Sequence, residues 1–91
     1  MAIVRIPSPL RKYTGGQAKV TIPGATVAEV MTNLAAAHPG IAPRIQNDDG
    51  SIKRFINVFV NEDEIRALNG DATTVSDMDE ISIIPAMAGG K

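Results

Sequence analysis

The last eleven residues of the chain read Ile-Ser-Ile-Ile-Pro-Ala-Met-Ala-Gly-Gly-Lys, from Ile81 to Lys91. Residues 81–84 form a short apolar run rich in β-branched side chains, which is typical of a buried strand. Pro85 has no N–H to donate to a sheet and should end the pairing. We therefore expect a core strand that leads directly into a tail of small side chains, residues 86–91.

The composition of this tail indicates a function. Ala88, Gly89 and Gly90 have almost no side chain, so they pack poorly and fit through a narrow channel. A diglycine also adopts backbone conformations that other residues avoid. We expect one domain over residues 1–85 and a flexible diglycine tail over residues 86–91 that enters the active site of another protein.

The rest of the chain carries strand and helix patterns in a defined order. Residues 4–6 and 18–22 alternate apolar and polar side chains, as paired strands do. Residues 26–29 (Thr-Val-Ala-Glu) form a capping box, and apolar residues at helical spacing continue to about residue 37. A strong strand follows at residues 53–61. This order predicts an α+β fold of the ubiquitin-like β-grasp type, with a mixed sheet of four or five strands and one main helix packed on one face.

Alternation along residues 53–61 places two aromatic side chains, Phe55 and Phe59, on the face away from the helix. One helix covers only one face of a sheet, so we expect both rings on an open surface, together with Leu10 and one residue of the last strand. An exposed apolar patch suggests a partner-binding surface, to which we also assign Met87 of the tail. The alternative is that a loop or the chain end covers the two rings.

Composition excludes several functions. The 91 residues suit a single domain, and a net charge of −1 gives no electrostatic attraction to nucleic acid or anionic membranes. The absence of cysteine excludes thiolate metal ligands and a thiol nucleophile, and one histidine, His38, cannot form a metal cluster. No apolar run approaches the roughly 20 residues of a membrane span. We expect a cytoplasmic protein that binds no metal and no cofactor.

Two polar segments have simpler interpretations than ligand binding. Gly15 and Gly16 lie before a predicted strand, whereas a phosphate-binding loop would lead into a helix, so a turn is favoured. The acidic pair Asp48 and Asp49 lacks the ligand spacing of a calcium loop, which indicates a solvated loop.

Three stretches of the sequence resemble one known family. They are residues 6–17, which contain Ile-Pro, Leu-Arg and Thr-Gly-Gly-Gln, residues 54–61, and residues 83–90. They resemble the ubiquitin-like sulfur carriers of the ThiS and MoaD group. Within this group the sequence is most similar to the CysO-type carriers of thiocarboxylate-dependent cysteine biosynthesis. The resemblance covers nearly the whole chain.

This resemblance implies a function for Gly90. An ATP-dependent enzyme of the ubiquitin E1 class would adenylate its terminal carboxylate, which then becomes a thiocarboxylate. The chain would be a co-substrate and not an enzyme. The implied partners are the E1-like adenylating and sulfur-transferring enzyme, a cysteine synthase or other sulfur-accepting synthase, and a JAMM-type metalloprotease. Lys91 departs from the family pattern, because family members act through a terminal glycine. It is either removed by the protease or an expression remnant.

Other functions stay open at this point. The chain resembles other ThiS and MoaD carriers as well, including the small subunit of molybdopterin synthase. A similar tail also serves ubiquitin-like modifiers that are joined to a lysine of a target protein. A non-catalytic interaction domain with a glycine-rich end is the third alternative.

Overall fold

A computed structural model describes residues 2–49 and 51–85 of the chain. No helix within these ranges is long and apolar enough to cross a membrane. The elements in chain order are β1 (Ala2–Arg5), the 3-10 helix η1 (Ser8–Thr14), β2 (Lys19–Ile22), α1 (Val27–Ala37), η2 (Pro39–Ile41), α2 (Ala42–Ile45), β3 (Ile56–Val60), β4 (Asp63–Glu64), η3 (Ile65–Ala67), η4 (Gly70–Ala72) and β5 (Glu80–Pro85).

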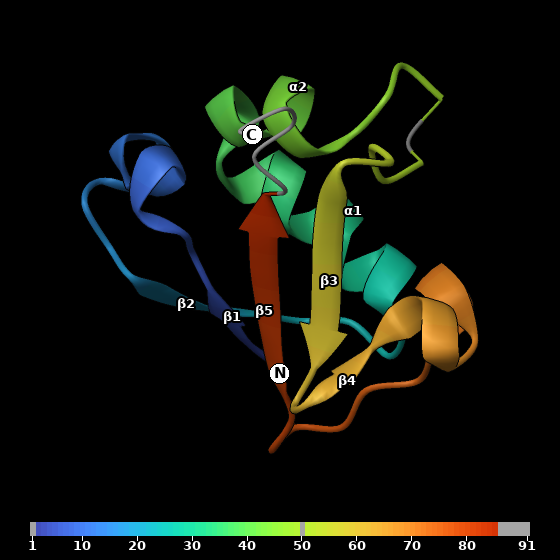
Figure 1. The fold of residues 1–91 in the computed structure, drawn as a ribbon. Helices are drawn as coiled ribbons and strands as arrows, with labels where there is room; N and C mark the ends of the chain where they lie inside the picture. Colours follow the sequence, from blue (N-terminus) through green and yellow to red (C-terminus); the bar gives the residue numbers. More distant parts are fainter. Residues whose placement is uncertain (1, 50, 86–91) are drawn as a thin grey trace.

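The strands form one mixed sheet in the order β2-β1-β5-β3-β4. β5 lies in the middle, parallel to β1 and antiparallel to β3, and α1 crosses behind the sheet (Figure 1). The remaining pairs, β1 with β2 and β3 with β4, are antiparallel. The predicted β-grasp fold with one main helix is therefore confirmed. The last strand of the sequence occupies the centre of the sheet.

The main helix begins where the capping box predicts. Thr26 Oγ1 accepts a hydrogen bond from the Glu29 backbone N–H at 3.2 Å. The Glu29 carboxylate reaches back one residue further than in the usual box and accepts from the Ala25 N–H at 3.0 Å. The helix ends at Ala37, where the His38 N–H still donates to a helical carbonyl and Pro39 starts the next element. The His38 backbone therefore closes the helix.

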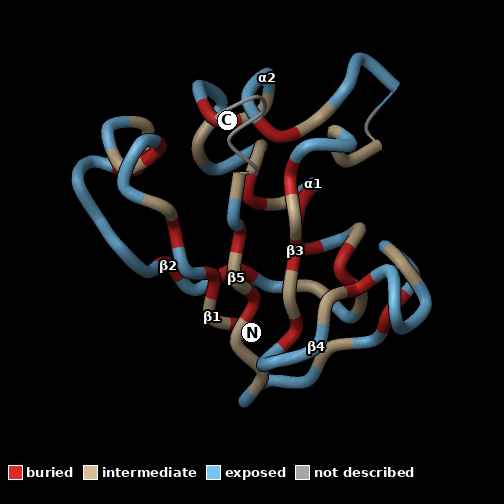
Figure 2. The backbone as a smooth tube through the Cα atoms, viewed as in Figure 1, coloured by how far each residue is buried: buried red, intermediate tan, exposed pale blue. Residues whose placement is uncertain are grey.

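The core lies between α1 and one face of the sheet. Buried residues alternate with partly exposed ones along β3 and β5, as the burial colours of Figure 2 show. The short helices η1, η2 and α2 close the end of this layer. The buried apolar residues are Ala2, Val4, Ile6, Leu10, Val20, Ile22, Val27, Val30, Met31, Leu34, Ile41, Ile45, Ile56, Val58, Val60, Ile65, Ile81 and Ile83.

The long connection between β1 and β2 contains the helix η1 and then a tight turn. Gly15 and Gly16 have φ angles of 67° and 86°, in the left-handed region that favours glycine. The buried hydroxyl of Thr14 bonds to the backbone carbonyls of Arg11 and Gln17 at 3.1 and 2.9 Å. These contacts confirm that the Gly-Gly pair forms a turn.

The predicted strand at residues 53–61 begins later than expected. β3 starts at Ile56, whose N–H donates to the Lys53 carbonyl at 2.9 Å and so closes a turn over the two residues between them. Phe55 therefore lies in this turn and not on the strand. The predicted strand includes three residues too many at its start, because an apolar side chain in a turn has the same sequence pattern as one on a strand.

One further expectation was wrong. Leu10 was placed on the open face, but it is only 7% exposed and belongs to the core, because η1 folds back over the end of the sheet. After β3 the chain returns as the two-residue strand β4, and Ile65 then begins the 3-10 helix η3.

Candidate functional site

The sequence predicts that the functional residues of the chain follow β5. Its side chains alternate, with Ile81 and Ile83 buried against the helix layer and Ile84 on the opposite face. Pro85 is the last described residue, and it still pairs with Ile56 of β3. The residues assigned to the tail (Met87, Ala88, Gly89, Gly90 and Lys91) lie outside the described residues. The described part of the site is therefore the surface around the end of β5.

The beginning of β5 is fixed by a network of hydrogen bonds. The carboxylate of Asp79 accepts from the Ser76 N–H at 2.9 Å and from Asn61 Nδ2 at 3.1 Å. These two bonds lower the pKa of Asp79 below its usual 3.8. Asn61, with a φ of 57°, also accepts from the Glu80 N–H at 3.1 Å. The strand that leads to the tail is thus fixed at its start by these side chains, and β3 pairs with it as far as Pro85.

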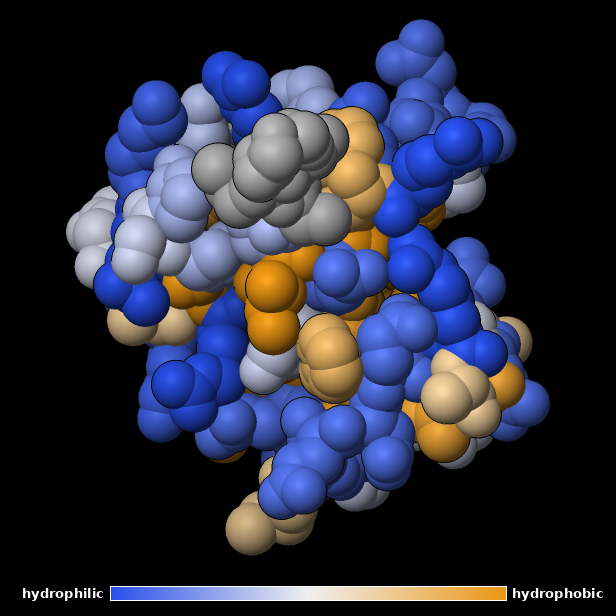
Figure 3. All heavy atoms as spheres, viewed as in Figure 1, coloured by the Kyte–Doolittle hydropathy of each residue, from blue (hydrophilic) through white to orange (hydrophobic). Residues whose placement is uncertain are grey.

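Apolar side chains gather on the open face of the sheet beside the end of β5. Ile84 is 47% exposed and Phe55 is 45% exposed, whereas Phe59 is half-buried. Ile84 is paired with Asn57, and Phe59 with Ser82, so these side chains share one face of neighbouring strands. Figure 3 shows an apolar centre over β5 and β3 with a hydrophilic rim. We call Ile84, Phe59 and Phe55 the open-face patch.

Cations line the border of this patch. Arg66 donates from Nη1 to Asn57 Oδ1 at 3.2 Å and from Nη2 to the Arg54 carbonyl at 2.8 Å. Lys53 Nζ lies 5.9 Å from the centre of the Phe55 ring, within the range of a cation–π contact. The contacts fix these positive charges beside exposed apolar side chains, an arrangement common in protein interfaces.

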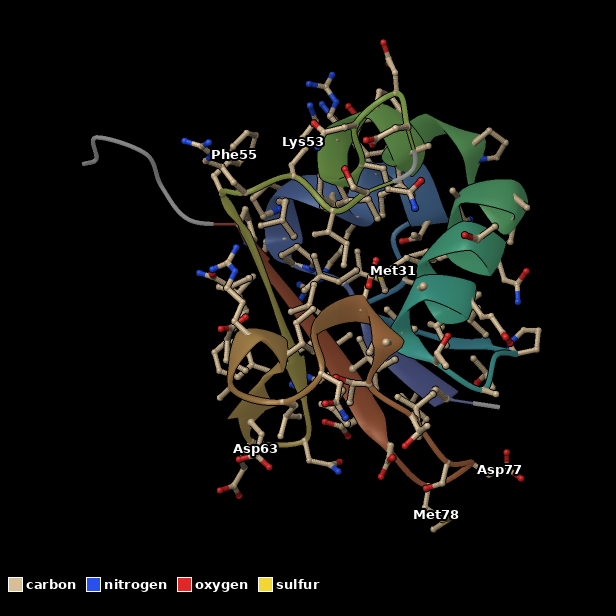
Figure 4. The ribbon with its side chains drawn as sticks, turned by 90° about the vertical axis from the view of Figure 1, so that its right-hand side faces the viewer. Met31, Lys53, Phe55, Asp63, Asp77 and Met78 are labelled. Atoms are coloured by element: carbon tan, nitrogen blue, oxygen red, sulfur yellow. The ribbon has the colours of Figure 1, made fainter. Side chains whose placement is uncertain are left out.

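The two ends of the molecule differ in charge. Phe55 and Lys53 lie at the end where β5 finishes, whereas Asp63, Asp77 and the exposed Met78 lie at the opposite end (Figure 4). A protein that approaches the end of β5 therefore meets positive charge around an apolar centre. Such an arrangement favours an acidic partner surface and disfavours a basic one.

The two predicted patch residues fall in different environments. Phe59 lies on β3, as expected, and Phe55 projects from the turn before it, so the structure brings both to the open face by different routes. Sequence reasoning left the exposed residue of the last strand unassigned, and it is Ile84. It missed Arg66 altogether, because this side chain reaches β3 only through the fold of η3 and carries no local sequence signal.

The described ranges contain no group of three His, Cys, Asp or Glu side chains that would hold a metal ion. The Asp48–Asp49 loop, considered above as a calcium site, instead forms a local turn in which Asp49 Oδ1 accepts from the Ser51 N–H and Oγ at 2.9 and 2.6 Å. These bonds lower the pKa of Asp49.

Comparison with known proteins decides the family. The model of the ThiS family matches residues 4–90, which spans the β-grasp domain and the diglycine. The chain belongs to the ThiS family. Its membership confirms the resemblance to the ubiquitin-like sulfur carriers.

Individual relatives agree with this assignment. The ThiS-family chain is 40% identical over 89 residues to the sulfur carrier protein CysO of Mycobacterium tuberculosis, covering 96% of each chain. It is also 41% identical over 66 residues to small archaeal modifier protein 3 of Haloferax volcanii, covering 72% of this chain and 71% of the relative. Among solved structures, a chain in the crystal structure of the Amycolatopsis orientalis BexX/CysO complex matches with a TM-score of 0.89 and 40% identity, covering 99% of this chain and all of the other.

Proposed function

We propose that this chain is a sulfur carrier protein of the cytoplasm that acts through a thiocarboxylate on Gly90 and supplies sulfur for cysteine biosynthesis. The main support is the family match through residue 90, together with the similarity to CysO over nearly the full length. The chain is a carrier and co-substrate and not a catalyst, in keeping with its relatives. Its own contribution is a reactive terminus and a surface that the enzymes recognise.

The chemistry starts from an unreactive group. A terminal carboxylate has a pKa of about 3.5, so it is ionised at neutral pH and repels nucleophiles. In the activating enzyme, an oxygen of the Gly90 carboxylate attacks the α-phosphorus of ATP and pyrophosphate leaves. Hydrosulfide or its equivalent then attacks the acyl carbon, the bond from that carbon to the AMP oxygen breaks, and AMP leaves with the electron pair. The product is the Gly90 thiocarboxylate.

The described structure supports this role through position. β5 pairs with β3 as far as Pro85, so the point from which the tail departs is held in the sheet. The open-face patch lies beside that point, and we assign Phe55 and Phe59, with Met87 of the tail, to recognition of the E1-like enzyme and of the sulfur-accepting synthase. The similar chain in the BexX/CysO complex supports action through protein partners.

Lys91 must be absent for this chemistry. With Lys91 attached, the Gly90 carbonyl belongs to a peptide bond, which resists adenylation because it has no free carboxylate oxygen. We propose that a JAMM-type zinc metalloprotease removes the residue with a metal-activated water before the first cycle. If Lys91 is an expression remnant, the same requirement for a free Gly90 holds.

The decisive experiment compares two forms of the protein. Chains ending at Gly90 and at Lys91 are incubated with the E1-like enzyme of the source organism, ATP and a sulfur source, and intact mass is measured. Only the Gly90 form should gain the mass of sulfur in place of oxygen. A form with Gly90→Ala that also ends at residue 90 controls for tail length and should be charged poorly. Equal charging of the Gly90 and Lys91 forms would show that Gly90 is not the working terminus.

A second function has specific support. The similarity to small archaeal modifier protein 3 favours attachment of Gly90 to lysine side chains of target proteins. The two functions differ in their products inside the cell. Carriage alone leaves a free thiocarboxylate, whereas modification yields a ladder of larger conjugates that contain this chain and disappear when Gly89 and Gly90 are deleted.

A further inference from the structure

A groove of about 220 Å³ opens beside the last residues of β5, on the side of β1. It exists because the parallel pairing of β1 with β5 stops at Arg5 and Ser82. Pro7 cannot continue the ladder, since it has no N–H, and the chain turns away into η1. β5 continues to Pro85 paired only with β3, which leaves a gap on the β1 side. Its lining combines apolar side chains with two arginines, Arg5 and Arg11.

Arg11 is held so that its charge faces the groove. Its Nε donates to the Ile6 carbonyl at 3.0 Å, which fixes the plane of the guanidinium at the wall of the groove. Its two terminal nitrogens have no hydrogen-bond or ion-pair partner among the described residues. Two parallel N–H donors on one planar group match the two oxygens of a carboxylate.

Arg5 supplies a second positive charge, but it is already partly neutralised. Its Nη1 lies 3.2 Å from Glu80 Oε1 on the neighbouring strand. The groove therefore keeps a net positive charge that belongs mainly to Arg11. The apolar wall formed by Ile84 and Pro85 reduces the access of water to an ion pair formed there, which strengthens it.

We propose that this groove, with Arg11 as its main contact, receives the carboxylate of an aspartate or glutamate on the protein that takes up the tail. This inference rests on the proposed function. The five residues after Pro85, as far as Gly90, span at most about 17 Å when extended. A protein that encloses Gly90 in its active site therefore covers the groove with the entrance of its channel.

The same distance argues against a nucleotide as the occupant. A nucleotide phosphate reacts with the Gly90 carboxylate, which the tail can carry up to about 17 Å from the groove. An acidic side chain at the mouth of the channel would instead lie next to the groove, where the tail leaves β5. It would also fix the orientation of the carrier, because the groove lies on one side of β5 and the open-face patch extends to the other.

The test measures binding of the chain ending at Gly90 to the E1-like enzyme by calorimetry, without nucleotide. Arg11→Gln should raise Kd at least tenfold. Arg11→Lys should recover only part of the affinity, because an ammonium keeps the charge but lacks the two-donor geometry. The matched control is Lys12→Gln, which removes one positive charge from the next residue of η1. Lys12 Nζ lies over the Tyr13 ring at 5.3 Å and is not part of the groove, so Kd should change less than twofold.

Arg11→Gln also removes the hydrogen bond to Ile6, so its effect needs a second measurement. In a charge exchange, Arg11→Glu is combined in turn with acidic-to-lysine substitutions at the mouth of the enzyme's channel. Recovery of binding with one of these substitutions would identify the partner carboxylate. Recovery with none would contradict the inference, as would equal effects of Arg11→Gln and Lys12→Gln.

Two other results would be equally informative. A loss of affinity that appears only when ATP is present would assign the groove to a phosphate and overturn the carboxylate. Normal binding and charging by Arg11→Gln would overturn the inference and leave the proposed function intact. By contrast, failure of the parent chain to bind the enzyme or to form a thiocarboxylate would contradict the proposed function itself.

Discussion

The two faces of the central strands have different compositions, although their residues alternate along the same backbone. On the helix side, β5 carries Ile81 and Ile83, both almost fully buried. On the open side it carries Ser82 and the exposed Ile84. The first face is closed by α1 and the short helices, whereas the second is covered by no element among the described residues. The comparison shows that the buried face determines the fold, whereas the open face is available for recognition.

Alanine substitutions of the neighbouring residues Ile83 and Ile84 should give the largest difference, which is a difference in the free energy of unfolding. Ile83→Ala removes a core side chain and should lower the free energy of unfolding by about 2–5 kcal/mol. Ile84→Ala removes the same atoms from the open face and should cost less than about 1 kcal/mol, since much of that side chain is already in water. Urea unfolding of both variants measures the difference. Equal destabilisation would mean that the open face is buried in the free protein.

Substitution of Phe59 tests the open face through its effect on binding affinity. Phe59→Ala should weaken binding to the E1-like enzyme by more than about 1 kcal/mol, because aromatic side chains often dominate interface energies. The control is Thr21→Ala, an exposed residue of the edge strand β2, which should bind normally. Calorimetric titration gives the affinities, and a thermal melt checks the fold. Unfolding of the Phe59 variant would place this ring in the core and reverse the assignment of the two faces.

The smallest effect concerns Asp79, at the end of β5 opposite the tail. Its pKa is lowered in the folded protein, mainly by the Ser76 N–H and then by Asn61. A lowered folded pKa stabilises the protein above the unfolded value of 3.8, and this contribution is lost as the pH falls through the folded pKa. Because Asp79 is only partly buried, we expect a modest loss. Urea unfolding of the parent and Asp79→Asn proteins at a series of pH values from roughly 5 to 2 should give a steeper fall for the parent. Parallel curves would contradict the assignment.

Local patterns predicted the parts of the fold that local forces control. The Thr26 cap and the apolar stripe of α1 follow from neighbours within a few residues, and so does the alternation of β5. Phe55 and Leu10 were misplaced because a turn and a 3-10 helix redirect side chains whose sequence pattern looks like a strand or an exposed loop. Phe55 lies just before the start of β3, where element boundaries are hardest to predict, and Leu10 lies within a 3-10 helix that packs on the core.

The candidate site also has parts that the sequence predicts and parts that it does not. The Gly-Gly tail and the aromatic residues of the 53–61 segment are visible in the sequence. The groove is not, because Arg11 reaches it from η1 and its other wall comes from a strand some 70 positions later. Arg66 is hidden for the same reason. Sequence reasoning found the residues with unusual composition and missed the common ones that the fold brings together.

The central position of β5 also affects how the molecule is made. Arg5 and Glu80, which bridge β1 and β5, are 75 residues apart in the chain. While the protein is being synthesised, β1 and β3 have no partner between them until the segment 80–85 emerges from the ribosome. A chain that stops before this segment has two unpaired strand edges in place of a sheet centre, and such species are prone to aggregation and proteolysis. Completion of the sheet therefore depends on the same segment that leads to the tail.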